Sequence, residues 1–87
     1  MNDDIVRLRN GVEWRHVEQE ILALDTASST FFNTNRAGAM LWAALAAGSS
    51  RAKLANVLVS EYAIEPDVAR RDADAFVDSL ARQGLLA

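Results

Sequence analysis

The chain has 87 residues, no cysteine and a formal net charge of −3, and these quantities limit what it can be. A chain of this length forms one small domain, so we expect a single domain over residues 1–87. The absence of cysteine excludes disulfides, thiolate metal sites and a nucleophilic thiol. Nine basic residues against twelve acidic ones argue against binding to nucleic acid, which depends on neutralising phosphates.

The first third of the chain is predicted to form strands. Residues 5–9 alternate loosely, and Asn10-Gly11 is a strong hairpin signal because both residues accept the positive φ of a type I′ turn. The run 12–18 is expected to return antiparallel with a period of two, which suits a sheet with one solvated side. A tight turn near Gln19 then leads to the apolar run 21–24, which suits the middle of a small sheet.

One more short strand is predicted after a cluster of turn formers at residues 25–29. Thr30, Phe31 and Phe32 are the β-branched and aromatic residues that favour it. The two phenylalanines point to opposite faces of such a strand, so we expect one in the core and the other exposed. If the strands form a meander, this strand lies at an edge and leaves one row of backbone groups unpaired.

The rest of the chain is predicted to form three helices. Asn33 or Asn35 caps the first, Gly48 ends it, and its apolar residues recur at helical spacing. Trp42 lies on the flank of that apolar stripe, and we interpret it, like Trp14, as a packing residue rather than a stacking platform.

The second helix is predicted to begin after Ser49 or Ser50, either of which can cap it. The third begins at Pro66, where a first helical turn tolerates proline because its missing N–H has no partner there. That helix is expected to run to about Gln83. Its core positions are Ala69, Ala73, Phe76, Val77 and Leu80.

Strands over about residues 5–33 and helices over about residues 35–83 predict an α+β fold. We expect a small antiparallel sheet of three to four strands followed by three helices, of winged-helix type. A DNA-binding transcriptional regulator of that type directs basic and amide side chains into the major groove. The third helix offers Arg70, Arg71 and Arg82, but aspartates are interleaved with them. We keep this regulator as the alternative that the charges disfavour, and a general protein-interaction adaptor as a third.

The sequence also lacks the residues of an active site. His16 is the only histidine, and no second ligand or nucleophile accompanies it at a recognisable spacing. The carboxylates Asp72 and Asp74 are predicted on a helix surface, and Asp3 and Asp4 at a frayed terminus. The four glycines are dispersed, so they form no phosphate loop. We therefore expect no enzyme activity, no metal site and no cofactor.

No membrane association is expected either. The longest stretch without a charged residue covers 14 residues, 37–50, and two glycines interrupt it, whereas a spanning helix needs roughly 20 apolar residues. The N-terminus has no charged-then-apolar leader of the secretory kind. We interpret the protein as cytoplasmic.

Several short motifs in a fixed order resemble the small PqqD-like proteins, which are also called RiPP recognition elements. The likeness extends from about Val12 over nearly the whole chain, and its motifs are fairly specific as a set. They are Leu24-Asp25, Phe31-Phe32, Asn35-Arg36-Ala37-Gly38-Ala39 with Leu41-Trp42, Gly48-Ser49, the helix 54–62, Glu65-Pro66, Arg71-Asp72, Phe76-Val77 and the closing run 80–86.

The resemblance implies a non-catalytic module that binds the leader segment of a ribosomally made precursor peptide. The leader is expected to add as an antiparallel strand to the edge of the last strand, in a groove closed by the third helix. The strand residues implied are Ser29, Thr30, Phe31, Phe32 and Asn33. On the helix we favour the shoulder formed by Val68, Asp72, Ala75, Phe76 and Ser79 over the one formed by Arg70, Asp74 and Ala81.

The same resemblance implies a precursor leader peptide and a separate maturation enzyme as partners. That enzyme is a leader peptidase in lasso-peptide pathways, or a radical SAM enzyme as in pyrroloquinoline quinone biosynthesis, and the sequence does not choose between them. The chain departs from the family pattern at Thr34-Asn35, where Leu-Asn is usual, and at Ala37-Gly38, where Thr-Gly is common. The first departure is expected to shift how the last strand is anchored, and with it the register of that strand.

Overall fold

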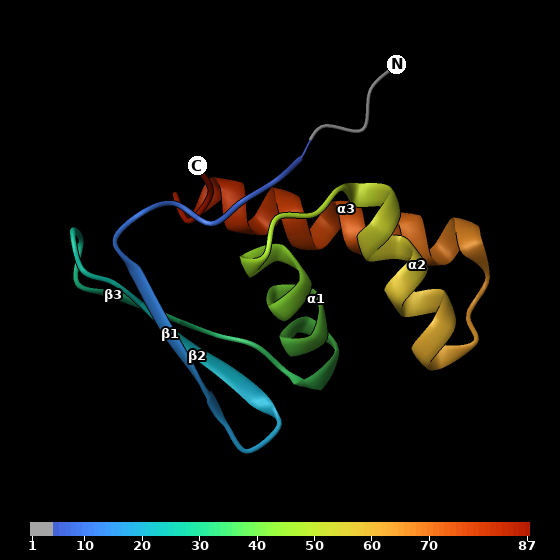
Figure 1. The fold of residues 1–87 in the computed structure, drawn as a ribbon, viewed down its shortest axis with the longest axis horizontal. Coiled ribbons are helices and arrows are strands. Elements are labelled where there is room, and N and C mark those ends of the chain that lie inside the picture. Colours follow the sequence, from blue (N-terminus) through green and yellow to red (C-terminus); the bar gives the residue numbers. More distant parts are fainter. Residues whose placement is uncertain (1–4) are drawn as a thin grey trace.

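The computed structural model describes residues 5–87 and contains three antiparallel strands followed by three helices (Figure 1). This confirms the predicted α+β fold, with three strands in the sheet, in the order β1-β2-β3. The elements are β1 (Val12–Val17), β2 (Glu20–Asp25), β3 (Thr30–Asn33), α1 (Arg36–Ala46), α2 (Arg51–Tyr62) and α3 (Pro66–Arg82).

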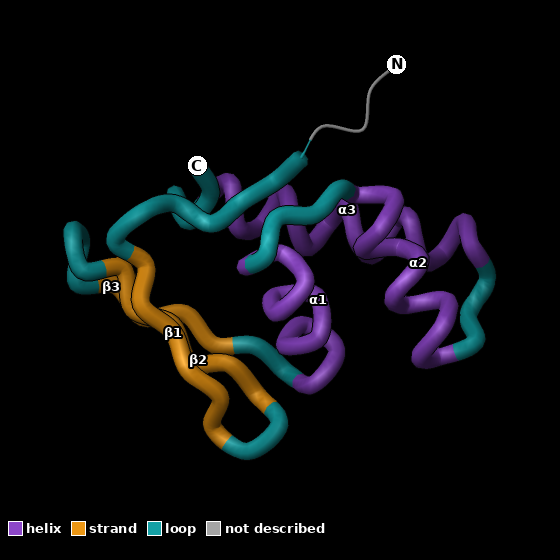
Figure 2. Tube along the Cα trace, in the orientation of Figure 1, coloured by secondary structure: helices purple, strands orange, loops and turns teal. Residues whose placement is uncertain are grey.

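The sheet lies on one side of the molecule and the helices on the other, with α1 between the strands and the α2–α3 pair (Figure 2). Alternation along β2 divides its side chains, because Ile21 and Ala23 are buried in the core while Leu22 and Leu24 are half-buried on the outer face. The turn between β1 and β2 places Glu18 at a positive φ of 60°, as tight hairpins require.

The structure differs from the prediction at residues 5–9, which form no strand of the sheet. A type I′ turn needs a positive φ at both central residues, and here Gly11 has a φ of 94° while Asn10 is not in that region. The segment instead passes along the helical side of the molecule (Figure 1). Single β-bridges join Val6 to Ser49 and Leu8 to Leu86. The segment therefore connects the α1–α2 loop to the residues that follow α3.

The predicted helix caps are confirmed. Asn35 Oδ1 accepts from the N–H of Gly38 at 2.8 Å, and Ser50 Oγ accepts from the N–H of Lys53 at 3.2 Å. Pro66 lies in the first turn of α3. Within residues 5–87, no helix has both the length and the apolar content that a membrane span needs.

The core is centred on Trp42 of α1, which is 0% exposed. Phe32 of β3 stacks on its ring with centroids 5.6 Å apart and 22° between the planes. Trp14 of β1 meets it edge-on at 6.2 Å. Both tryptophans thus pack as the sequence predicted, and both outer strands of the sheet are held to α1.

Thr34 anchors the end of β3 through both its backbone and its side chain. Its N–H donates to Ile21 O at 3.0 Å, and its Oγ1 accepts from the N–H of Ile21 at 3.2 Å. The hydroxyl also donates to Asn35 O at 2.9 Å. The side chain therefore takes the place of a backbone carbonyl and extends the β2–β3 ladder by one pair.

We predict that Thr34→Val destabilises the protein by about 1–3 kcal/mol, because the variant leaves the buried N–H of Ile21 without an acceptor. Denaturant unfolding followed by circular dichroism measures this change. Thr30→Val is the control on the same strand. The Thr30 hydroxyl bonds to Ser28 at an exposed position, where water can replace it, so we expect the substitution to change stability by less than about 0.5 kcal/mol. Equal effects of the two substitutions would contradict the anchoring role of Thr34.

Candidate functional site

The outer edge of β3 is open, because the sheet order ends there and no other strand of residues 5–87 pairs with it. The hydrogen bond from Thr34 N to Ile21 O shows which β3 residues face β2. In an antiparallel ladder every second residue directs its N–H and C=O groups toward the neighbouring strand. Thr30, four positions before Thr34, therefore also faces β2. The N–H and C=O groups of Phe31 and Asn33 consequently point to the open side.

The two phenylalanines of β3 have separate environments. Phe31 projects from the outer face of the sheet and is 67% exposed, whereas Phe32 stacks on Trp42 in the core. One ring is thus exposed, as predicted, and the other is half-buried and packs against the core. Only Phe31 is therefore available to a ligand through its ring.

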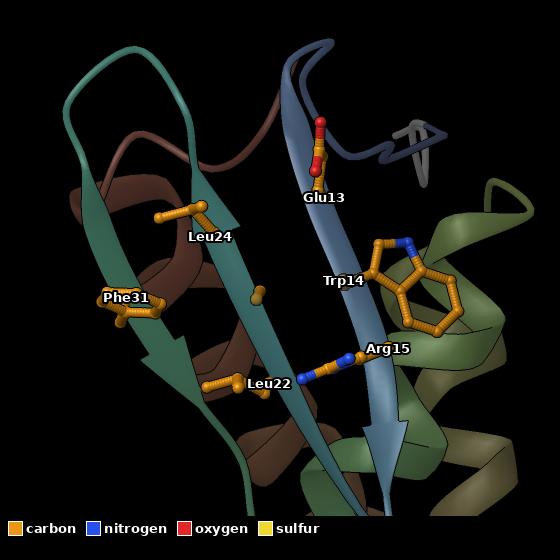
Figure 3. A pocket seen from close by; sticks show the side chains of 7 residues that line it. Glu13, Trp14, Arg15, Leu22, Leu24 and Phe31 are labelled. Carbon is orange, nitrogen blue, oxygen red and sulfur yellow. The ribbon is translucent and has the colours of Figure 1, made fainter.

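A shallow hollow of about 290 Å³ lies on the outer face of the sheet beside Phe31 (Figure 3). Leu22 and Leu24 on β2 lie between Phe31 on one side and Glu13 and Arg15 on the other. These neighbours of Phe31 were not predicted as site residues from the sequence. The sequence carries no signal for the two leucines, because residues 21–24 are uniformly apolar and do not show which side chains face outward. The hollow is lined by Glu13, Trp14, Arg15, Leu22, Ala23, Leu24 and Phe31.

Asp25 organises the turn that leads into β3. The carboxylate is buried and accepts from Arg9 Nη2 at 2.5 Å, Ser28 Oγ at 3.0 Å and the N–H of Ala27 at 3.1 Å. The Arg9 hydrogen bond, supported by the other two, lowers the pKa of Asp25 although burial opposes it. Arg9 Nε also donates to Gly84 O at 2.7 Å, which links this turn to the end of α3.

The two shoulders of α3 differ in what covers them. Arg51, at the start of α2, contacts Asp74 Oδ1 at 3.0 Å and Asp78 Oδ1 at 2.8 Å. The hydrogen bond from Arg51, followed by that from Arg70, lowers the pKa of Asp74. These ion pairs occupy the shoulder that was disfavoured on the sequence.

The favoured shoulder lies on the other flank of the buried stripe of α3. Its residues Val68, Asp72 and Ala75 are exposed, and Phe76 and Ser79 are half-buried. Phe76 also packs against the core. The hollow beside Phe31 includes none of these residues.

The described residues offer little to metal or redox chemistry. No group of three or more histidine, cysteine, aspartate or glutamate side chains within residues 5–87 is close enough together to hold a metal ion. His16 lies on β1, where its ring meets that of Trp14 edge-on at 5.8 Å. Asp3 and Asp4, which the sequence places at a frayed terminus, lie outside the described residues.

A small three-stranded sheet with a supporting helical layer defines a domain of the α+β class. The family model described as coenzyme PQQ synthesis protein D (PqqD) matches residues 20–86. The chain therefore belongs to the PqqD family.

Three solved structures resemble the chain over nearly its whole length. A lasso peptide synthetase B1 complexed with its leader peptide is 32% identical with a TM-score of 0.84, over 94% of this chain and 96% of that one. TbiB1 in complex with the TbiA(beta) leader peptide is 24% identical with a TM-score of 0.87, over 92% and 93%. No curated protein matches the chain by sequence.

The third is a PqqD truncation of Methylobacterium extorquens PqqCD, a functional and stand-alone RiPP recognition element. It is 20% identical with a TM-score of 0.76, over 97% of this chain and 89% of that one. At this identity, as for TbiB1, the likeness concerns the fold.

We predict that the contribution of Asp25 to stability is lost in acid. Its pKa is lower in the folded protein than the ordinary value of 3.8, so the carboxylate stabilises the fold above that pH and ceases to do so as the pH falls through the lowered pKa. Urea unfolding of wild type and Asp25→Asn between about pH 7 and pH 2 measures the difference. It should be largest near neutrality and shrink below about pH 4. A difference that is constant with pH would contradict the ion-pair assignment.

Proposed function

We propose that this protein binds the leader segment of a ribosomally synthesised precursor peptide and presents it to a separate modifying enzyme or peptidase. The observation that carries the proposal is the open edge of β3, where the backbone groups of Phe31 and Asn33 point outward. An extended peptide added there gains main-chain hydrogen bonds for affinity and side-chain contacts for selectivity. Membership of the PqqD family and the leader-bound lasso relative support it.

The second wall of the binding groove in this proposal is the favoured shoulder of α3. The start of α2 occupies the opposite shoulder through Arg51, Asp74 and Asp78, which leaves the first one accessible to a peptide. Asp72 is exposed on this shoulder, and in this proposal its carboxylate holds a basic leader residue. Phe76 is half-buried on the same flank and offers the floor of an apolar pocket.

The partner enzyme supplies the chemistry, and this protein acts without catalysis in the cytoplasm. The relative that is 32% identical is a lasso peptide synthetase component, which favours a leader peptidase as the partner. A radical SAM enzyme is the other candidate, since the family is described by its part in PQQ synthesis. A short precursor and one of these enzymes, encoded beside this chain, would distinguish the two pathways.

An NMR titration tests the proposal with a synthetic leader peptide from a short precursor encoded nearby. We expect the amides of residues 29–33 to shift, and Asn33→Pro to weaken binding about fivefold or more, because it removes an N–H that points to the peptide. That N–H is unused within the sheet, so the circular dichroism spectrum should be unchanged. Unmoved amides at 29–33, together with shifts in α2 or α3 on adding duplex DNA, would instead favour the winged-helix regulator.

Replacing one alanine on each shoulder of α3 by arginine tests which shoulder lines the groove. Ala75 and Ala81 are both exposed on this helix, but they lie on opposite flanks of its buried stripe. We expect Ala75→Arg to weaken leader binding about tenfold or more by steric blockage, and Ala81→Arg to change it by less than about twofold. Isothermal titration calorimetry measures both. The reverse order of effects would assign the groove to the other shoulder.

A further inference from the structure

β1 forms a second open edge of the sheet, at the side opposite β3. The N–H of Thr26 donates to Gly11 O at 3.2 Å, so odd-numbered residues of this stretch face β2. The backbone N–H and C=O groups of Trp14 and His16 therefore point outward. The carbonyl of Val12 does too, while its N–H makes a long 3.4 Å contact with Arg9 O.

This edge lacks most of the devices that usually prevent strands from pairing with other chains. Natural edge strands are shortened, bulged, interrupted by proline, covered by another element or lined with charged side chains, and of these β1 has only charges, one acidic and one basic. β1 has six residues, all of them paired in regular register with β2, and contains no proline. All of its residues after Val12 are exposed, so no described element covers it.

Two opposite charges lie two residues apart on the outer face of β1. Glu13 and Arg15 are both exposed, and they stand opposite Leu24 and Leu22 of β2. Among residues 5–87, neither side chain has an ion-pair partner. Each charge is thus available to a partner that approaches along the open edge.

We propose that β1 pairs antiparallel with β1 of a second copy of this chain, about a two-fold axis at Trp14. The contact joins two three-stranded sheets into one of six strands. Trp14 N–H donates to the carbonyl of the partner's Trp14, and His16 N–H donates to that of the partner's Val12, each bond occurring twice by symmetry. On the outer face Glu13 stands opposite the partner's Arg15, and Arg15 opposite the partner's Glu13.

The charges select this register over its neighbours. A shift of two residues places either Glu13 opposite the partner's Glu13 or Arg15 opposite the partner's Arg15, and like charges directly opposite each other are destabilising. A shift of one residue disrupts the matching of inner and outer faces. In the proposed register the Trp14 rings, each 36% exposed, also become cross-strand neighbours, an aromatic pairing that stabilises sheets.

The contact closes on itself, because each copy uses the same edge. It leaves both β3 edges open at the far ends of the joined sheet, so it is independent of the peptide binding proposed above. The contact involves one strand of six residues per copy, which places it among small, weak interfaces. We expect a dimer that dissociates on dilution.

Sedimentation equilibrium over a concentration series tests the proposal through charge reversal. Glu13→Arg and Arg15→Glu should each weaken self-association about tenfold or more, because each places like charges opposite each other at both pairs. An equimolar mixture of the two variants should form a heterodimer of about wild-type affinity, since every pair across the axis again joins an acid and a base. The double variant Glu13→Arg/Arg15→Glu should also recover.

His16→Pro provides a test at the backbone, since it removes an N–H that the isolated sheet does not use. We expect it to abolish self-association, with circular dichroism confirming that the fold remains. A wild-type protein that stays monomeric up to about 1 mM would overturn the proposal. Self-association that neither charge variant weakens would also overturn it.

Discussion

The packing around Trp42 is the interaction on which the rest of the structure depends. The ring is buried between Phe32 of β3 and Trp14 of β1, so one side chain of α1 holds both outer strands of the sheet. A three-stranded sheet is marginal by itself in water, and contact with a helix supplies the apolar burial it needs. Because β1 and β3 are both held by side-chain contacts with Trp42, neither strand needs a further partner strand at its outer edge. The N–H and C=O groups along the two edges can therefore pair with other chains.

Local chemistry explains which parts of the fold could be predicted. The caps at Asn35 and Ser50 were readable because the sequence itself carries the signal. The path of residues 5–9 was not, because it depends on contacts with Ser49 and Leu86 that lie far away in sequence. The Asn10-Gly11 signal indicated a turn correctly, but long-range pairing determined the partners of the segments on its two sides.

The candidate site was also predicted only in part, because some of its features depend on local sequence patterns and others on contacts between distant residues. The edge position of β3 and the exposure of one of its two phenylalanines follow from strand order and period-two alternation, whereas the structure shows that the exposed one is Phe31. Other features of the site depend on residues that are 16 or more positions apart in sequence. Arg9 binds Asp25, and Arg51 binds Asp74 on one shoulder of α3. No local pattern reveals such contacts, although they determine how β3 begins and which flank of α3 stays open.

The unequal placement of the two tryptophans has an optical consequence. Trp42 is wholly buried beneath Phe32, whereas Trp14 is partly in contact with solvent on β1. Trp42 contacts a ring of each edge strand, Trp14 of β1 at 6.2 Å and Phe32 of β3 at 5.6 Å. The intrinsic fluorescence of this chain therefore reports on events at either open edge without any label.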